Sequence, residues 1–109
     1  MKLSKKAELL ICLIYKEYLQ RIKDGVSPDR ANYYQNSAVI QEEIASKLTK
    51  EETASLCWTL FNNGFLNVGP GDNIANYISL TDAGIAYMEG RFERKLEKIS
   101  KYINLFKIN

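Results

Sequence analysis

The sequence predicts a single, mainly α-helical domain with a long helix near each end and one small β-hairpin. Its 109 residues are close to the commonest domain size and are enough to form a hydrophobic core. Apolar residues recur at helical spacing towards both ends of the chain, whereas residues 74–80 alternate as a half-buried strand does. The composition, with 46% hydrophobic and 26% charged residues, is that of an ordinary globular protein.

The first helix is predicted over residues 4–23, with Ser4 as its N-cap and Gly25 as its stop. One apolar stripe runs along it, made of Ala7, Leu10, Ile11, Ile14, Tyr18 and Ile22. Leu9, Leu13 and Leu19 widen this stripe until the middle of the helix is apolar nearly all round. Such a helix is buried on more than one side. We therefore expect a partner subunit to cover Leu9 and Leu13.

A short helix should follow, because Ser27 and Pro28 form a good start signal; we expect it to end near Tyr34. A helix-turn-helix pair is predicted over about residues 38–63. Its first helix has apolar residues at Ile40, Ile44 and Leu48.

The second helix of the pair opens with a capping box formed by Thr49 and Glu52, directly after Leu48. Thr53, Leu56, Cys57, Leu60 and Phe61 are expected on its apolar face. Gly64, in the left-handed conformation, should end it. The two helices thus meet through a tight junction, as a helix-turn-helix requires.

A β-hairpin is predicted over about residues 65–80, with strands at 65–68 and 74–80 around a Gly- and Pro-containing turn. Thr81 and Asp82 should then cap a last helix that runs to about residue 106. Its later apolar residues are spaced as in a heptad repeat: Leu96, Ile99, Ile103 and Phe106. This seam either packs on the first helix or joins two copies of the chain.

The residue types argue against an enzyme. The chain has no histidine, and therefore lacks the usual general base near neutral pH and the commonest metal ligand. Cys12 and Cys57 lie in apolar helical runs, and we expect two buried, reduced thiols in preference to a disulfide. Phosphate-binding glycine motifs are also missing. We expect no catalytic residue, no metal and no cofactor.

The longest apolar run near the start of the chain, residues 9–15, is too short for a membrane span of ~20 residues. No cleavage site for a signal peptide follows it. We therefore expect a cytoplasmic protein that does not interact with membranes.

Three segments carry a resemblance to a known superfamily: residues 44–48 (IASKL), 60–66 (LFNNGFL) and 78–84 (ISLTDAG). In order and spacing they resemble the winged helix-turn-helix proteins, in the style of the small MarR- and PadR-like regulators, over about residues 38–90. The resemblance implies a small DNA-binding transcriptional regulator. Its wing would be the hairpin at 65–80, within one domain that spans residues 1–109. A homodimer is expected on separate grounds, from the apolar surface of the first helix and the heptad spacing of the last helix.

The resemblance also implies which residues face double-stranded DNA. The second helix of the pair would enter the major groove, and the wing would touch the adjacent backbone. Carried onto this chain, the DNA-facing residues are Lys47, Lys50, Ser55, Thr59, Asn62 and, at the wing tip, Asn73. Glu51 and Asp72 would lie beside them. The dimer interface would draw on Leu9, Leu13, Leu96, Ile99, Ile103 and Phe106.

The distribution of charge along the chain does not fit DNA binding in a simple way. Residues 1–23 carry a net charge of +4, residues 24–90 of −6, and residues 91–109 of +4. The segment that should read DNA is therefore acidic, although phosphate contacts normally come from Lys and Arg. Two hypotheses fit: a DNA-binding regulator whose basic terminal helices contribute phosphate contacts, or a winged-helix module that binds a protein partner and not DNA. Fold alone does not decide between them.

Overall fold

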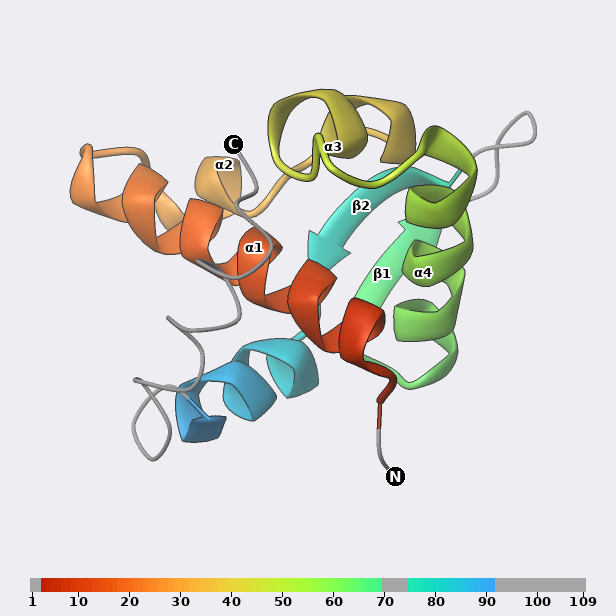
Figure 1. Ribbon diagram of the computed structural model, residues 1–109. Coiled ribbons are helices and arrows are strands. Elements are labelled where there is room, and N and C mark those ends of the chain that lie inside the picture. The colour runs from red at the N-terminus through yellow and green to blue at the C-terminus, as the bar shows by residue number, and fades with distance from the viewer. Residues whose placement is uncertain (1–2, 70–74, 92–109) are drawn as a thin grey trace.

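The computed structural model describes residues 3–69 and 75–91 (Figure 1). It is mainly helical, with one antiparallel hairpin, as the sequence predicts. Its elements are α1 (Lys5–Lys23), α2 (Pro28–Ala31), α3 (Ser37–Glu43), α4 (Lys50–Asn62), β1 (Leu66–Gly69) and β2 (Asn76–Leu80). Residues 82–91 form a further helical segment. Among the described helices, none is long and apolar enough to cross a membrane.

The predicted bounds of α1 are confirmed, and its caps explain them. The Ser4 hydroxyl accepts a hydrogen bond from the Ala7 amide at 3.2 Å, which satisfies one of the free donors of the first turn. At the other end Asp24 is the C-cap, and Gly25 follows with φ of +92°. Glycine adopts that left-handed conformation without a steric penalty, so the helix ends there.

The short helix α2 ends at Ala31, three residues before the predicted end near Tyr34. The reason is a partner far along the chain: residues 32–37 run antiparallel along β2. The side-chain amide of Asn32 bonds both backbone groups of Leu80, and the Tyr34 amide donates to the Ile78 carbonyl at 2.9 Å. The Ser37 amide donates to the Ala75 carbonyl, also at 2.9 Å. The Tyr34 amide is therefore engaged with β2 and is not available for a further turn of α2.

The first helix of the pair, α3, is shorter than predicted. It ends at Glu43, and Leu48 lies outside it, so the junction with α4 is six residues long and not a direct contact at Leu48 and Thr49. The backbone turns back at Ala45, whose amide bonds to the Ile40 carbonyl, and the Leu48 carbonyl accepts from the Gln41 side chain at 2.8 Å. Ile40 and Leu48 are nevertheless both buried, as their spacing predicts.

The capping box that opens α4 is present in both directions. The Glu52 amide donates to the Thr49 hydroxyl at 3.0 Å, and the Thr49 amide donates to the Glu52 carboxylate at 3.2 Å. Gly64 has φ of +81° just after the C-cap, also as predicted. One side chain is misplaced by the prediction: Phe61 is 41% exposed and does not belong to the buried face of α4.

The hairpin β1–β2 is antiparallel and pairs Leu66 with Leu80 and Asn67 with Ser79. Its register shifts by a bulge between Asn67 and Gly69. After β2, the Thr81 hydroxyl accepts from the Gly84 amide at 2.9 Å and so caps the helical segment 82–91. The predicted continuation of this helix to about residue 106 lies outside the described residues.

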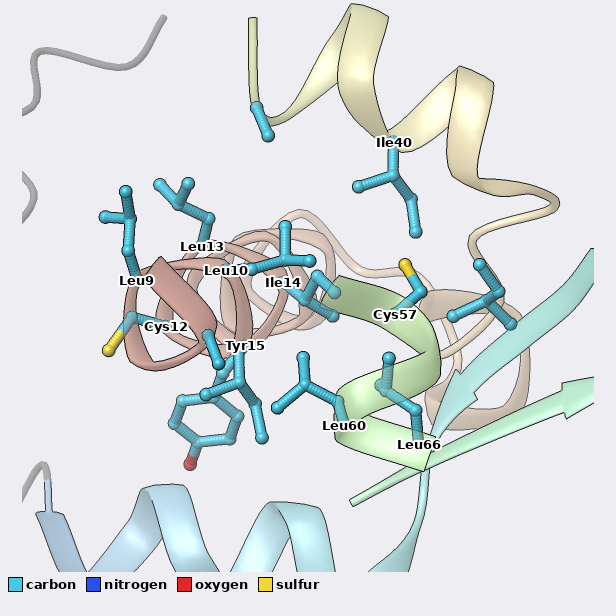
Figure 2. Close-up of a cluster of buried hydrophobic side chains, with 14 of the residues drawn as sticks. Leu9, Leu10, Cys12, Leu13, Ile14, Tyr15, Ile40, Cys57, Leu60 and Leu66 are labelled. Carbon is cyan, nitrogen blue, oxygen red and sulfur yellow. The ribbon is translucent and has the colours of Figure 1, made fainter. Parts of the chain in front are cut away.

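The core surrounds α1, which runs through the middle of the molecule between α3 and the helical segment 82–91 (Figure 1). Side chains from four elements converge on it, among them Ile14 of α1, Ile40 of α3, Leu60 of α4 and Leu66 of β1 (Figure 2). All side chains from Ala7 to Tyr15 are buried. This central position explains why the middle of α1 is apolar nearly all round.

The burial of α1 bears on the expectation that a partner subunit covers this helix. Leu9 and Leu13 are 0% and 5% exposed within the single chain, so covering them does not require a second subunit. The expectation for the thiols, by contrast, is confirmed: Cys12 and Cys57 are buried and unpaired. Burial raises the pKa of each thiol to about 12, which keeps both of them protonated and unreactive at neutral pH.

Candidate nucleic-acid interface

The outer face of α4 meets solvent. Thr53, Cys57 and Leu60 are buried on the inner face. The opposite face carries exposed residues, namely Glu51, Ser55, Trp58, Thr59 and Asn62, which we call the α4 ridge. Their spacing of three and four residues places them on one side of a helix with 3.6 residues per turn. Three residues predicted to face DNA, Ser55, Thr59 and Asn62, therefore lie together on this ridge.

One lysine lies on each flank of the α4 ridge at its N-terminal end. Lys50 is the first residue of α4 and forms an ion pair with Glu42 of α3, with Nζ to Oε2 at 3.2 Å. On the other flank, Glu52 forms an ion pair with Lys6 of α1. Residues two apart on a helix point about 200° from one another, so these two pairs lie on opposite sides of Glu51. The packing of α1 against α4 thus places a cation from the N-terminal helix beside the predicted recognition helix.

Both lysines remain accessible in these pairs. Their side chains are 53% exposed for Lys6 and 54% exposed for Lys50. The Glu52 carboxylate also has a local role in the fold, because it completes the capping box of α4. The hydrogen bond from Lys6, followed by the one from the Thr49 amide, lowers the pKa of the Glu52 carboxyl, so the group stays ionised near neutral pH.

The other residues predicted to face DNA or to form the dimer interface are not part of the α4 ridge. Lys47 is exposed in the turn between α3 and α4. Asn73 and Asp72, expected at the wing tip, lie outside the described residues. So do four residues of the predicted dimer seam, Leu96, Ile99, Ile103 and Phe106.

Two aromatic side chains are exposed on α4 in addition to the residues predicted to face DNA. Trp58 was not predicted to have a role, and Phe61 was predicted on the buried face. Trp58 is 38% exposed and meets the ring of Phe61 edge to face, with centroids 5.6 Å apart. The helical pattern does indicate that Trp58 is exposed, because position 58 falls outside the apolar spacing of residues 53, 57 and 60. Phe61 was ambiguous, since it lies four residues after the buried Cys57. An exposed aromatic pair is a common feature of protein-binding surfaces.

A second polar cluster lies inside the fold, away from the α4 ridge. Glu8 of α1 is only 6% exposed, and its carboxylate accepts from the Tyr87 hydroxyl and pairs with Arg91 at 2.8 Å. The Arg91 guanidinium also stacks 5.4 Å from the centre of the Tyr87 ring. Every carboxylate oxygen of Glu8 therefore has a partner. The cluster ties α1 to the helical segment 82–91.

Comparison of the chain with protein-family models, with curated proteins and with solved structures found no match.

Proposed function

We propose that this chain is a small winged-helix transcriptional regulator that binds double-stranded DNA through α4. The observation that carries the proposal is the α4 ridge, on which exposed Ser, Thr and Asn side chains lie beside Glu51 and Trp58, with one accessible lysine on each flank. The order of elements supports it: a helix pair, then a hairpin, then a further helix. In a helix-turn-helix protein the second helix of the pair enters the major groove.

The chemistry of the ridge suits that role. Ser, Thr and Asn side chains donate and accept hydrogen bonds, so Ser55, Thr59 and Asn62 can meet base edges. Phosphates line both sides of the major groove, which is ~12 Å wide. A helix lying in it therefore needs a cation on each flank, and Lys6 and Lys50 meet that need. The positive end of the α4 dipole lies at the same N-terminal end.

The proposal includes a homodimer, because helix-turn-helix proteins commonly bind two half-sites of a palindrome as a two-fold dimer. Since Leu9 and Leu13 are buried within the chain, the interface would use the apolar residues beyond Arg91. Sedimentation at micromolar concentration tests this part separately. A species twice the chain mass of 12.5 kDa is expected, and a monomer alone would refute it.

A salt-dependent anisotropy titration with a labelled mixed-sequence duplex tests DNA binding. Lys50→Ala should weaken binding and lower the log–log salt slope by about 0.9, the value for one phosphate contact. Glu51→Gln should strengthen binding, because it removes a negative charge from the ridge. Lys23→Ala is the matched control: it lies about 25 Å from Lys6 along α1, by the helical rise of 1.5 Å per residue, and should change nothing. If wild type and all variants show no affinity at low salt, DNA binding is wrong.

A second candidate function is recognition of a protein partner through the same side of α4. The exposed Trp58–Phe61 pair favours it, because Trp is enriched at the energetic centres of protein interfaces. So does the excess of carboxylates around α4, since DNA interfaces are strongly positive. This alternative predicts negligible duplex affinity and no response to Lys50→Ala or Glu51→Gln.

A further inference from the structure

Both lysines on the flanks of the α4 ridge are bound by carboxylates from neighbouring positions in the fold. Lys6 of α1 is held by Glu52 of α4, and Lys50 of α4 is held by Glu42 of α3. Lys50 also approaches the Gln41 side-chain oxygen at 3.4 Å. Each cation that would meet a phosphate is thus already partly neutralised in the free protein.

These ion pairs are weak enough to be exchanged. All four side chains are between 37% and 59% exposed. Exposed ion pairs of this kind contribute little to stability, because water screens them and the long side chains lose freedom. A phosphate oxygen offers lysine the same charge-assisted hydrogen bond as a carboxylate does. A duplex in contact with the ridge therefore competes directly with Glu42 and Glu52.

We propose that Glu42 and Glu52 act as internal competitors of the DNA backbone, and that Lys50 and Lys6 exchange them for phosphates when a duplex binds. This inference rests on the proposed function and assigns a mode of regulation to the same site. The carboxylates lower the affinity for any duplex, so binding at physiological salt would depend more on contacts to the bases. The competition by Glu42 and Glu52 weakens as the salt concentration rises, because both ion pairs are exposed and are screened by salt.

Glutamine substitutions test the exchange, with anisotropy of a labelled mixed-sequence duplex as the readout. Glu42→Gln and Glu52→Gln each remove one competing charge and should raise the affinity about three- to fivefold at low salt. Glutamine at position 52 preserves the capping box, since Gln also serves as its third residue. Circular dichroism then verifies that both variants are folded.

The matched control is Glu43→Gln. Glu43 is exposed, adjoins Glu42, and forms no ion pair within the described part of the chain. Glu43→Gln makes the same change in net charge as Glu42→Gln. Its smaller effect on affinity therefore measures the general loss of repulsion between the protein and the phosphates. We expect Glu42→Gln to exceed it at low salt, and the difference to shrink at high salt.

A double-mutant cycle completes the test. In a Lys50→Ala background the gain from Glu42→Gln should fall to that of Glu43→Gln, while the gain from Glu52→Gln should persist. The Lys6→Ala background should show the reverse. If wild type binds but all three glutamine variants gain equally, the exchange is refuted and DNA binding stands. If no protein in the series binds the duplex, both the exchange and the proposed function are refuted.

Discussion

The carboxylate of Glu8 on α1 and the guanidinium of Arg91 are 2.8 Å apart, and the Glu8 side chain is only 8% exposed. This ion pair ties residue 91 of the helical segment 82–91 to the central helix α1. A buried carboxylate that loses its cation is costly, because neither water nor another charge replaces the lost interaction.

Arg91→Ala should therefore destabilise the protein. The full cost of breaking a buried pair is ~3–5 kcal/mol, but Arg91 is 28% exposed, and we expect about 2 kcal/mol. Thermal unfolding should show a Tm lower by about 8 °C. Arg30→Ala is the control, because Arg30 is exposed and forms no ion pair within the described residues. Equal Tm values for the two variants would contradict a structural role for the pair.

Gly84 lies closer to another backbone segment than Gly25, Gly64 or Gly69 does. A Cβ atom built on Gly84 would lie 2.2 Å from the Phe65 carbonyl oxygen, which belongs to the backbone after α4 and cannot move aside easily. Gly84→Ala should therefore destabilise by about 3 kcal/mol, as overpacking does. Helix propensity alone predicts the opposite sign, a gain of about 1 kcal/mol. Chemical denaturation decides between the two, and a more stable variant would contradict the contact.

Local signals predicted much of this fold because their partners are close in sequence. Ser4 bonds the amide of Ala7, Thr49 and Glu52 bond each other, and Gly64 needs no partner to adopt its left-handed conformation. Each of these interactions spans at most three residues. A pattern of residue types therefore suffices to find it.

Contacts between distant residues were missed, and so was one local feature, the early end of α3 where the Ala45 amide bonds to the Ile40 carbonyl. Asn32 pairs with Leu80 across 48 positions, and this pairing ends α2 early. Lys6 pairs with Glu52 across 46 positions, which moves a cation to a helix that appeared acidic in sequence. The Glu8 cluster has the same character, because Tyr87 lies 79 positions away. The sequence indicated the Glu8 cluster only through one glutamate within an otherwise apolar run of α1.

The two buried thiols make the stability of the protein fall at high pH. Burial raises the pKa of Cys57 from 9.0 to about 12, and that of Cys12 equally, so the folded state keeps protons that the unfolded chain loses. This contribution to stability is complete below pH 9 and is lost as the pH rises from 9 towards 12. Between those limits each thiol contributes a slope of about −1.4 kcal/mol per pH unit.

Urea denaturation at pH 8, 9 and 10 measures this slope. Cys57→Ala should reduce it, at the cost of a lower stability at pH 8. Thiol labelling provides an independent measurement: a chromogenic thiol reagent at pH 8 should modify neither cysteine in the folded protein and both in urea. Rapid modification under native conditions would contradict the burial of the thiols.

Trp58 is the only tryptophan of the chain, and it lies on the α4 ridge. Because it is 38% exposed, its fluorescence in the free protein should be readily quenched by acrylamide. If α4 enters the major groove, a bound duplex covers the indole ring, and the quenching constant should fall by about half or more once the 38% exposure is lost. The measurement needs no label and reports on α4 alone.

The same experiment separates two ways of binding DNA. If the basic ends of the chain held the duplex and α4 did not, anisotropy would report binding while the quenching of Trp58 stayed unchanged. Trp58→Phe, combined with a tryptophan placed at the exposed Tyr33, serves as the control, because Tyr33 belongs to the loop after α2 and not to α4. Protection of Trp58 without protection at position 33 is the result expected for a recognition helix. Equal protection at both positions, or none at Trp58 under saturating duplex, would contradict the placement of α4 in the groove.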